Sequence, residues 1–376
     1  MSKKGKLRVG VIFGGRSGEH EVSIASAQSV MKSLDGKKYD TIPIGITKKG
    51  AWIVGSKAVT YLKNGLKKIP AKSMLAPDPT EHHLVSVGHG RAKSSPFALD
   101  VVIPVIHGTY GEDGTLQGLF ELANIPYVGA GVLGSAVGMD KVVQKQLFSA
   151  VGLPIVRYQW FLSSSWKKNK RQIYSKIEKN FSYPMFTKPS NAGSSVGISK
   201  CHNRRELILG VNDAVQYDRK IVVEQGIENI HEIEVSVLGN DTPRASVPGE
   251  IIPSNEFYDY DAKYVDGKSQ AIIPAKLPVT VMRQLRELAV RAFLSLDLAG
   301  MARVDFLVTK KTHKIYINEV NTIPGFTSIS MYPKLWEASG LSYSKLLDQL
   351  IVLALSRHVG KQKLATSYQP KHAWYK

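Results

Sequence analysis

Two β-type runs near the C-terminus constrain this chain more than any other feature. RVDFLV and KIYINEVN, within residues 303–321, flank a polar turn and predict a hairpin. A symmetric register sets Asp305 opposite Glu319, and it sets Arg303 opposite Asn321. Side chains alternate along a strand, so these four project from one face and the apolar residues between them from the other. The hairpin therefore predicts a sheet with a buried apolar face and a polar site on its opposite face.

The two carboxylates on that polar face need positive charge nearby. Asp305 and Glu319, directly opposite each other, would repel and would be costly to desolvate. With the amide of Asn321 they form an oxygen-only ligand set, which favours Mg²⁺ or Mn²⁺ with water and phosphate oxygens as the remaining ligands. The alternative is a structural network in which Arg303 and other cations neutralise the carboxylates. Spacing alone leaves both interpretations open.

The order of predicted elements indicates an α/β chain, α+β in parts, with three domains. A strand, a helix and a second strand open the chain, and a third apolar run follows a polar insertion at about 50–97. This pattern predicts a parallel sheet, followed by a β-rich central region and an α+β region. The predicted domains are 1–138, 139–240 and 241–360, the last with a tyrosine-rich loop at 253–276, and a surface tail occupies 361–376.

A loop rich in glycine and serine, KPSNAGSSVG at 188–197, is a candidate phosphate cradle. Gly193 and Gly197 allow the backbone to approach a ligand, and Ser194 and Ser195 add hydroxyl groups. Lys188 opens the loop with a positive charge. The spacing differs from that of a P-loop, so an exposed flexible loop remains the alternative.

Several further acids and one histidine stand at the ends of predicted strands. Glu224 and Glu232 are placed to accept from an adenine amine and from ribose hydroxyls, or else are ordinary surface glutamates. Glu19 opens the first helix, where it could hold a ligand ammonium group or simply complement the helix dipole. His107 begins HGTYGEDGT, directly after the third strand. Ligands bind at such strand ends in open α/β sheets.

The amino-acid composition narrows the kinds of partner expected for the protein and the cellular compartment in which it is expected. The net charge is +19, but the lysines are scattered, which favours a solvated basic surface over a nucleic-acid site. A single cysteine, Cys201, excludes an intramolecular disulfide and fits a reducing cytoplasm. The first apolar run ends at Phe13, too early for a signal peptide, and no run is long enough to cross a membrane. We therefore expect a cytoplasmic protein without nucleic-acid or membrane partners.

Seven motifs together give the chain a specific resemblance. GGRSGEHEVS, HGTYGEDGTLQG, MDK, KPSNAGSSVG, FYDYDAKY, ARVDF and NEVNTIPGFT occur in the order in which they stand in D-alanine–D-alanine ligases of the ATP-grasp superfamily, which the chain resembles over residues 7–358. The resemblance implies a substrate domain, a central ATP-binding lobe and a C-terminal catalytic lobe. It also implies ATP-dependent joining of two D-alanines, through a D-alanyl phosphate, to the dipeptide used in peptidoglycan precursors. A homodimer is typical of such proteins.

The same resemblance implies a role for individual residues. Those matching catalytic positions are Glu19, Ser194, Tyr264, Arg303, Gly325 and Ser330, with His107 and Met331 at the substrates. Those matching ATP contacts are Lys141, Lys188, Ser195, Glu224, Gln225, Ile227, Glu232 and Lys263. Asp305, Glu319 and Asn321 match the ligands of two Mg²⁺ ions, for which Mn²⁺ is an alternative. Ser194 and Tyr264 match a pair that ties a mobile loop to Glu19.

Two departures and two alternatives accompany the resemblance. Met331 stands where many members have leucine, and Gly226 stands where some have a bulkier residue beside the adenine. A ligase that joins D-alanine to D-lactate or D-serine is the alternative within the family. A basic nucleotide- or nucleic-acid-binding protein without catalysis is the alternative from another class.

Overall fold

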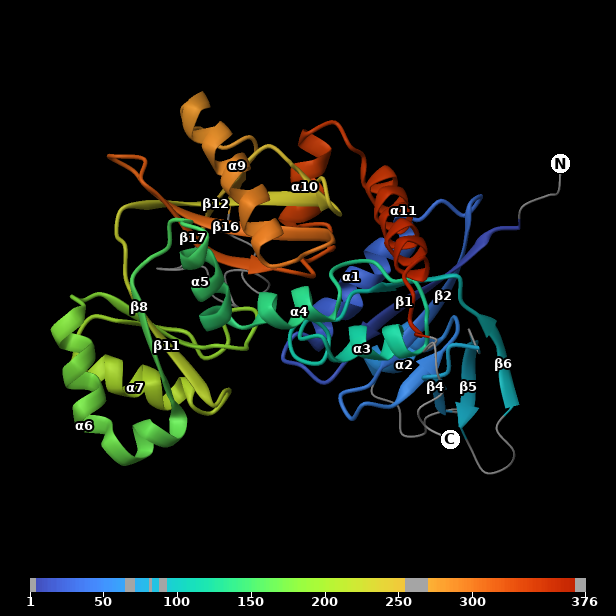
Figure 1. The fold of residues 1–376 in the computed structure, drawn as a ribbon, viewed down its shortest axis with the longest axis horizontal. Coiled ribbons are helices and arrows are strands. Elements are labelled where there is room, and N and C mark those ends of the chain that lie inside the picture. The colour runs from blue at the N-terminus through green and yellow to red at the C-terminus, as the bar shows by residue number, and fades with distance from the viewer. Residues whose placement is uncertain (1–4, 65–71, 81–82, 88–92, 254–269, 369–376) are drawn as a thin grey trace.

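Three β-sheets follow one another along the chain in the computed structural model, which describes residues 5–64, 72–80, 83–87, 93–253 and 270–368. Figure 1 shows the first sheet on the right, the second at the lower left and the third above it. Helices cover each sheet, and the third sheet lies between the other two along the length of the molecule. The mixed α/β architecture with three sheets agrees with the predicted fold class.

The first sheet has seven strands in the order β6-β5-β4-β3-β2-β1-β7. β1 pairs in parallel with β2 and with β7, as the opening pattern predicts. β3 to β6 pair antiparallel and extend the sheet at its β2 side. These four strands lie in the polar insertion at about 50–97, for which the sequence predicts no elements because it carries little periodic signal. The strands are β1 (Leu7–Gly14), β2 (Tyr39–Ile46), β3 (Trp52–Val54), β4 (Lys72–Leu75), β5 (His83–Val87), β6 (Lys93–Ala98) and β7 (Val101–Pro104).

Helices from both ends of the chain enclose this sheet. On one face, α1 (His20–Ser33) and the last helix, α11 (Tyr343–Gln362), pack against Val9, Val11 and Phe13 of β1. On the other face, α3 (Thr115–Leu122) packs against Ile12. The C-terminal helix therefore shares a core with the N-terminal sheet, which holds the two ends of the chain together. The helices α2 (Ala58–Asn64) and α4 (Val132–Met139) complete this region.

The second sheet is a separate antiparallel unit. Its order is β10-β9-β11-β8, and its core includes Trp166, Met185 and Ile221. This agrees with the β-rich central region that the sequence predicts. The elements are α5 (Lys141–Ala150), β8 (Tyr158–Leu162), α6 (Ser163–Asn180), β9 (Met185–Pro189), β10 (Ser199–Cys201), α7 (Arg204–Ala214) and β11 (Lys220–Gln225).

The third sheet carries the predicted hairpin. Its order is β15-β14-β12-β16-β17, with β13 paired to β12, so β17 lies at one edge. β12 falls within the predicted central domain but pairs with this sheet, and the predicted domain boundaries stay predictions. The elements are β12 (Ile230–Gly239), β13 (Arg244–Ala245), β14 (Gly249–Ile252), β15 (Gln270–Ile272), α9 (Val279–Ser295), β16 (Gly300–Thr309), β17 (Ile315–Asn321) and α10 (Met331–Ala338).

The hairpin register is confirmed where the site lies and shifts beyond it. Arg303 pairs with Asn321 and Asp305 with Glu319, whereas Phe306 pairs with Ile317. The irregularity leaves Asn318 as an extra residue on β17, as in a β-bulge. The apolar face of the hairpin packs under α9, as the alternation predicts.

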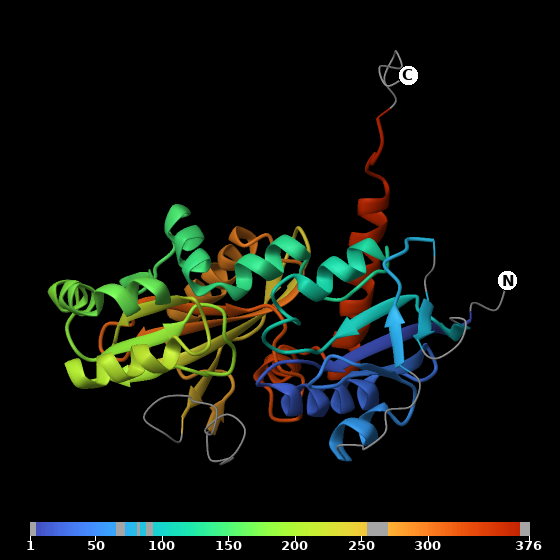
Figure 2. The ribbon, with the colours of Figure 1, turned by 90° about the horizontal axis from the view of Figure 1, so that it is seen from below.

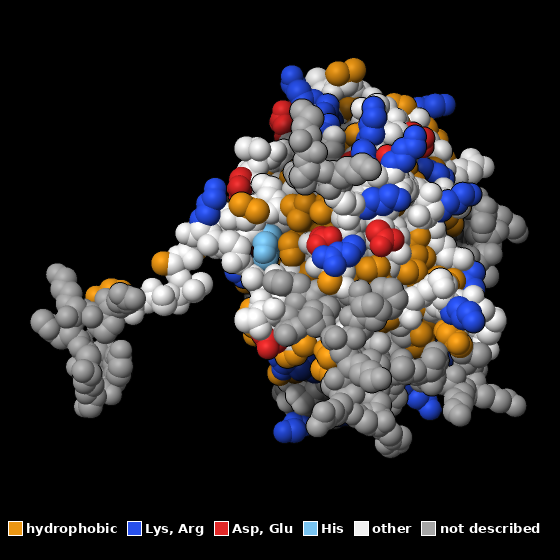
Figure 3. Space-filling view, turned by 90° about the vertical axis from the view of Figure 1, so that its right-hand side faces the viewer, with side chains coloured by type: hydrophobic (Ala, Val, Ile, Leu, Met, Phe, Trp, Pro, Cys, Tyr) orange, Lys and Arg blue, Asp and Glu red, His pale blue; other side chains and the backbone are white. Residues whose placement is uncertain are grey.

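Three observations concern the outside of the described molecule. No helix in the part of the chain that the structure describes is long and apolar enough to cross a membrane. On the face shown in Figure 3, several Lys and Arg side chains gather over the upper part, with a few Asp and Glu side chains among them. Figure 2 shows the end of α11 standing out from the body, and residues 363–368 beyond it are exposed.

Candidate active site

Two adjoining cavities lie where the three sheets meet. They share Ser195, Glu234 and Glu319 in their linings. Every predicted site residue that the structure describes lines one of the two. The first contains Glu19, His107, Lys141, Ser194, Ser195, Arg303, Glu319, Asn321, Gly325, Ser330 and Met331, and the second contains Lys188, Ser195, Glu224, Gln225, Ile227, Glu232, Asp305 and Glu319. Lys263 and Tyr264 lie outside the described residues.

The glycine- and serine-rich loop closes against the first helix in the first cavity. The Ser194 hydroxyl donates a hydrogen bond to Glu19 Oε1, which connects the loop between β9 and β10 to the start of α1. Ser194 and Ser195 both have positive φ, at 46° and 60°, a conformation that side chains other than glycine seldom adopt. A Cβ atom on Gly193 would stand 2.2 Å from Glu19 Oε2. The loop therefore needs glycine at 193 to reach the carboxylate.

His107 lies at the floor of the same cavity and holds the segment after β17. It is 3% exposed, with Nδ1 3.0 Å from the Ile323 carbonyl oxygen and Nε2 3.1 Å from Ser26 Oγ. The Phe326 N–H donates to that same Ser26 Oγ at 3.3 Å. Burial lowers the pKa of His107, although Glu19 opposes the shift. The ring is thus a neutral group that bridges the N-terminal sheet and the Ile323–Phe326 segment.

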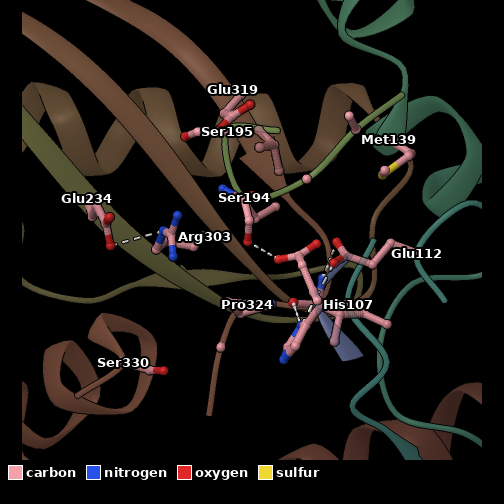
Figure 4. Close-up of a pocket in the computed structure, with 18 of the residues that line it drawn as sticks. His107, Glu112, Met139, Ser194, Ser195, Glu234, Arg303, Glu319, Pro324 and Ser330 are labelled. Carbon is pink, nitrogen blue, oxygen red and sulfur yellow. Dashed lines mark hydrogen bonds and ion pairs between the residues drawn. The ribbon is translucent and has the colours of Figure 1, made fainter. Parts of the chain in front are cut away.

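Glu112 is a buried acid that sequence reasoning missed. One carboxylate oxygen accepts from the Gly108 N–H at 3.0 Å, and the other accepts from the Ile323 N–H at 3.2 Å and the Thr322 hydroxyl at 3.3 Å. Burial, reinforced by the nearby Glu19 carboxylate, raises the pKa of Glu112 to about 8. Figure 4 shows Glu112 beside His107 on the side of the cavity opposite Arg303. Glu112 lies in the motif HGTYGEDG, but no role was predicted for the acidic residues of that motif.

Arg303 lies between two carboxylates on the polar face of the third sheet. Its Nε is 2.7 Å from Asp305 Oδ1 and 3.0 Å from Glu234 Oε2 (Figure 4 shows the second contact). The Asn321 amide also donates to Asp305, at 2.9 Å. Glu319 takes a different partner, the Lys141 ammonium group at 3.2 Å. Arg303 and Lys141 therefore supply positive charge to the carboxylates of this face, and both interpretations that spacing left open stay predictions.

The donor set on this face nevertheless fits a hard divalent cation. Asp305, Glu319 and Asn321 offer carboxylate and amide oxygens next to two lysines. Across the described residues there is no group of three or more His, Cys, Asp and Glu side chains that could hold a metal by itself. A cation bound here would thus need oxygen ligands from phosphate and water, as proteins that bind Mg²⁺ with a nucleotide commonly provide.

A second buried glutamate lies deep in the second cavity between two lysines. Glu224 Oε1 is 2.9 Å from Lys145 Nζ, and Oε2 is 2.8 Å from Lys188 Nζ. Burial alone would favour the neutral acid, but the two ammonium groups outweigh it and lower the pKa of Glu224 to about 2. Lys145 was not predicted as a site residue. The predicted contact of Glu224 with adenine stays a prediction, and its carboxylate faces the lysines here.

Other predicted residues make specific contacts around the two cavities. Lys141 donates to the Ala192 carbonyl oxygen at 2.8 Å and so connects α5 to the serine loop. Ser330 precedes α10, and its hydroxyl lies 2.8 Å from Thr327 Oγ1. Met331 is 5% exposed and packs with Ile251 and Leu335, which makes it mainly a core residue. A Cβ atom on Gly226 would stand 2.5 Å from the Pro184 carbonyl oxygen, which explains the glycine there.

Sequence comparison identifies the family to which this arrangement belongs. The profile described as "D-ala D-ala ligase N-terminus" matches residues 8–130, and the profile described as "D-ala D-ala ligase C-terminus" matches residues 147–352. The chain belongs to the D-alanine–D-alanine ligase family. The two matched segments contain every predicted site residue except Lys141, which falls between them.

Similar proteins span this member of the ligase family almost from end to end. The D-alanine–D-alanine ligase of Heliobacterium modesticaldum is 50% identical over 366 residues, covering 97% of this chain and 99% of that protein. The one from Geobacillus thermodenitrificans is 48% identical over 365 residues, covering 97% and 100%.

Solved structures of ligases share the fold. The D-alanine–D-alanine ligase from Coxiella burnetii has a TM-score of 0.82 at 38% identity and covers 95% of this chain and 96% of its own. VanG D-Ala:D-Ser ligase from Enterococcus faecalis has a TM-score of 0.81 at 37% identity, covering 93% and 100%. The ATP-grasp architecture that the resemblance implied is therefore shared with enzymes named for two different second substrates.

Proposed function

We propose that this protein joins two D-alanine molecules to D-alanyl-D-alanine with ATP as the energy source. The observation that carries the proposal is the convergence of three sheets on one cleft. The Glu19–Ser194 contact stands at one end of the cleft, and the face of Asp305 and Glu319 stands at the other. The product would serve as a peptidoglycan precursor, and the protein would work in the cytoplasm, as a homodimer.

The first substrate would bind between the N-terminal sheet and the serine loop. Glu19 would accept a hydrogen bond from its ammonium group, and His107 would lie near its carboxylate. The contact between Ser194 and Glu19 would keep the loop over this substrate and exclude water. Tyr264 would take part in the same closure. Excluding water protects an acyl phosphate from hydrolysis.

The nucleotide would extend into the second cavity. Lys141 and Lys188 would neutralise phosphate oxygens, while Glu232, Gln225 and Ile227 would border the ribose and adenine. Ser195, Lys263 and Glu224 complete the proposed ATP contacts. Asp305, Glu319 and Asn321 would hold Mg²⁺ or Mn²⁺, which would supply charge neutralisation at the phosphates.

The resemblance to the family implies two steps for substrates placed in this way. A carboxylate oxygen of the first D-alanine attacks the γ-phosphorus of ATP, and ADP leaves. The amine of the second D-alanine then attacks the carbonyl carbon of the acyl phosphate, phosphate leaves, and the amine loses a proton. Arg303 and the Gly325 N–H lie on the same cavity wall and would donate to the oxyanion of the tetrahedral intermediate. Such donors commonly lower the activation free energy by about 3 kcal/mol.

The second substrate is the point at which related enzymes differ. Ser330 and Met331 border the cavity where its carboxylate would bind. A D-alanine–D-serine activity is the second candidate, because a solved structure of similar fold and 37% identity carries that name.

Phosphate release from ATP tests the proposal. With D-alanine and Mg²⁺ we expect release of phosphate, with the dipeptide identified by mass, and no release with L-alanine. Competition between D-alanine and D-serine or D-lactate separates the candidates within the family. Turnover only with D-lactate or only with L-amino acids would refute the proposed substrate.

A further inference from the structure

The strand that carries Glu319 and Asn321 lies at the edge of its sheet. β17 pairs with β16 on one side, and no strand of the described residues pairs along its other side except for an isolated bridge between Ile155 and Ile317. An edge strand presents backbone N–H and C=O groups that need partners, and unpaired groups let a strand shift or twist. Contacts on the outer side of β17 therefore determine how firmly the strand holds the side chains of Glu319 and Asn321 in one direction.

The side chain of Gln144 takes the place of a neighbouring strand at this edge. Its Oε1 accepts from the Val320 N–H at 3.0 Å, and its Nε2 donates to the Val320 carbonyl oxygen, also at 3.0 Å. The second N–H of the same amide donates to the Gly138 carbonyl oxygen. Gln144 is 2% exposed, so these contacts exclude water. A primary amide has the donors and acceptor needed for all three contacts.

In the strand, Val320 lies directly between Glu319 and Asn321, the two residues whose side-chain directions matter for the site. Its side chain is 3% exposed and points into the core under α9, so the side chains of Glu319 and Asn321 point to the cavity face. Two hydrogen bonds to one residue fix the rotation of the strand about its axis as well as its distance from α5. The direction of both oxygen-bearing side chains depends on that rotation.

The same face of α5 also carries the lysines of the site. Lys141 lies 3.2 Å from Glu319, and Lys145 donates to the Asn318 carbonyl oxygen at 3.3 Å while pairing with Glu224. Gln144 is within one helical turn of both, so α5 brings the lysines and the carboxylate strand together in one rigid unit.

We propose that Gln144 is a positioning residue that holds Val320 and thereby directs Glu319 and Asn321 toward the metal–nucleotide complex. The inference deepens the proposed function and rests on it for the identity of that complex. Gln144 touches neither substrate nor cation in this role. Outer-shell partners of metal ligands typically change metal affinity by about 10–100-fold when removed.

The test replaces the amide by an apolar group of similar length, Gln144→Met. Asn240→Leu is the matched control, because Asn240 also joins two backbone groups through its amide, the Leu353 carbonyl and the Gly300 N–H, away from both cavities. Hydrogen exchange of the Val320 amide reports the strand contact. Electron paramagnetic resonance of Mn²⁺ with a non-hydrolysable ATP analogue reports binding without turnover.

In Q144M we expect faster exchange of the Val320 amide and about tenfold weaker Mn²⁺–nucleotide binding, with neither change in N240L. If Q144M does not fold, Gln144→Asn retains the primary amide but is shorter by one methylene group, so it cannot span both groups of Val320, and both readouts should move in the same direction by less. Unchanged exchange would overturn the proposal, and so would faster exchange with unchanged Mn²⁺ binding. A wild-type protein that makes no dipeptide but shows the expected pattern would refute the proposed function and leave the role of Gln144 intact.

Discussion

Glu112 and Glu224 are both buried glutamates at the candidate active site, yet their pKa values move in opposite directions. Around Glu112 the partners are backbone N–H groups, one hydroxyl and the carboxylate of Glu19, and its pKa rises to about 8. Around Glu224 the partners are two ammonium groups, and its pKa falls to about 2. Equal burial thus gives a protonated acid in one cavity and a carboxylate in the other.

The difference shows that the neighbours of a buried acid, more than its depth, decide its charge. Desolvation alone raises the pKa of any buried carboxyl group. The pKa of Glu224 is lowered instead, because Lys145 and Lys188 each contact one of its oxygens.

Glu224→Gln should give the largest effect on stability. It removes the shared partner of Lys145 and Lys188 and leaves two buried ammonium groups close together. Breaking a buried ion pair in this way typically costs about 3–5 kcal/mol in the free energy of unfolding. Urea unfolding at pH 7 measures it. A variant as stable as the wild type would show that the contacts of Lys145 and Lys188 with Asn318 are enough to hold the two ammonium groups.

Glu319→Gln should affect turnover strongly and stability little. Glu319 lines both cavities, its side chain is 20% exposed and it pairs with Lys141 at 3.2 Å, so we expect the substitution to change the site more than the core. We expect at least about a 100-fold loss of the phosphate-release rate, since changes to outer-shell partners alone cost 10–100-fold. Urea unfolding of the same sample serves as the control. An active variant would remove the argument for a cation on this face.

The pH dependence of stability should distinguish the two buried glutamates. For Glu112 the folded pKa, about 8, is above the ordinary value of 4.5, so the folded state holds a proton that the unfolded state has lost between these values. Stability should therefore fall as pH rises across this window, by up to about 1.4 kcal/mol per pH unit. Glu112→Gln cannot titrate and should lack this slope. Parallel pH profiles for wild type and variant would contradict the raised pKa.

For Glu224 the sign is reversed. Its folded pKa, about 2, is below the ordinary 4.5, so its contribution to stability is present above pH 4.5 and is lost as pH falls toward 2. The difference in unfolding free energy between wild type and E224Q should shrink over that range. Acid titration followed by circular dichroism measures this change. A constant difference down to pH 2 would assign the effect of the substitution to packing instead.

Glu178→Gln should give the smallest effect. Glu178 pairs at 2.7 Å with Arg204, whose side chain is 59% exposed, so water screens this pair more than the pairs of Glu224. Glutamine keeps an acceptor for the Tyr183 hydroxyl, and we expect no measurable change in the urea midpoint. This variant is the more exposed counterpart of E224Q, and a comparable loss of stability in both would mean that burial is not what makes the Glu224 pairs important.

The hairpin and the cleft residues were predictable because their signals are local. The register of Asp305 against Glu319 follows from alternation on either side of one turn, and the structure has that register. Glu19 and Ser194 were assigned to one site from motif resemblance, and the structure brings them into contact. Their roles in catalysis stay predictions. The strands of residues 52–98 were missed because short runs without alternation gain their structure from the sheet edge they extend.

Residue types and their spacing by themselves determined the family, the three-region order and the oxygen-rich face of the third sheet. Only the tertiary structure decided which partners each buried group has. Glu112, Lys145 and Gln144 became visible as parts of the site when chain segments far apart in sequence came within hydrogen-bonding distance. The physical reason is that charge state and strand position depend on contacts at about 3 Å, which the linear order of residues does not specify.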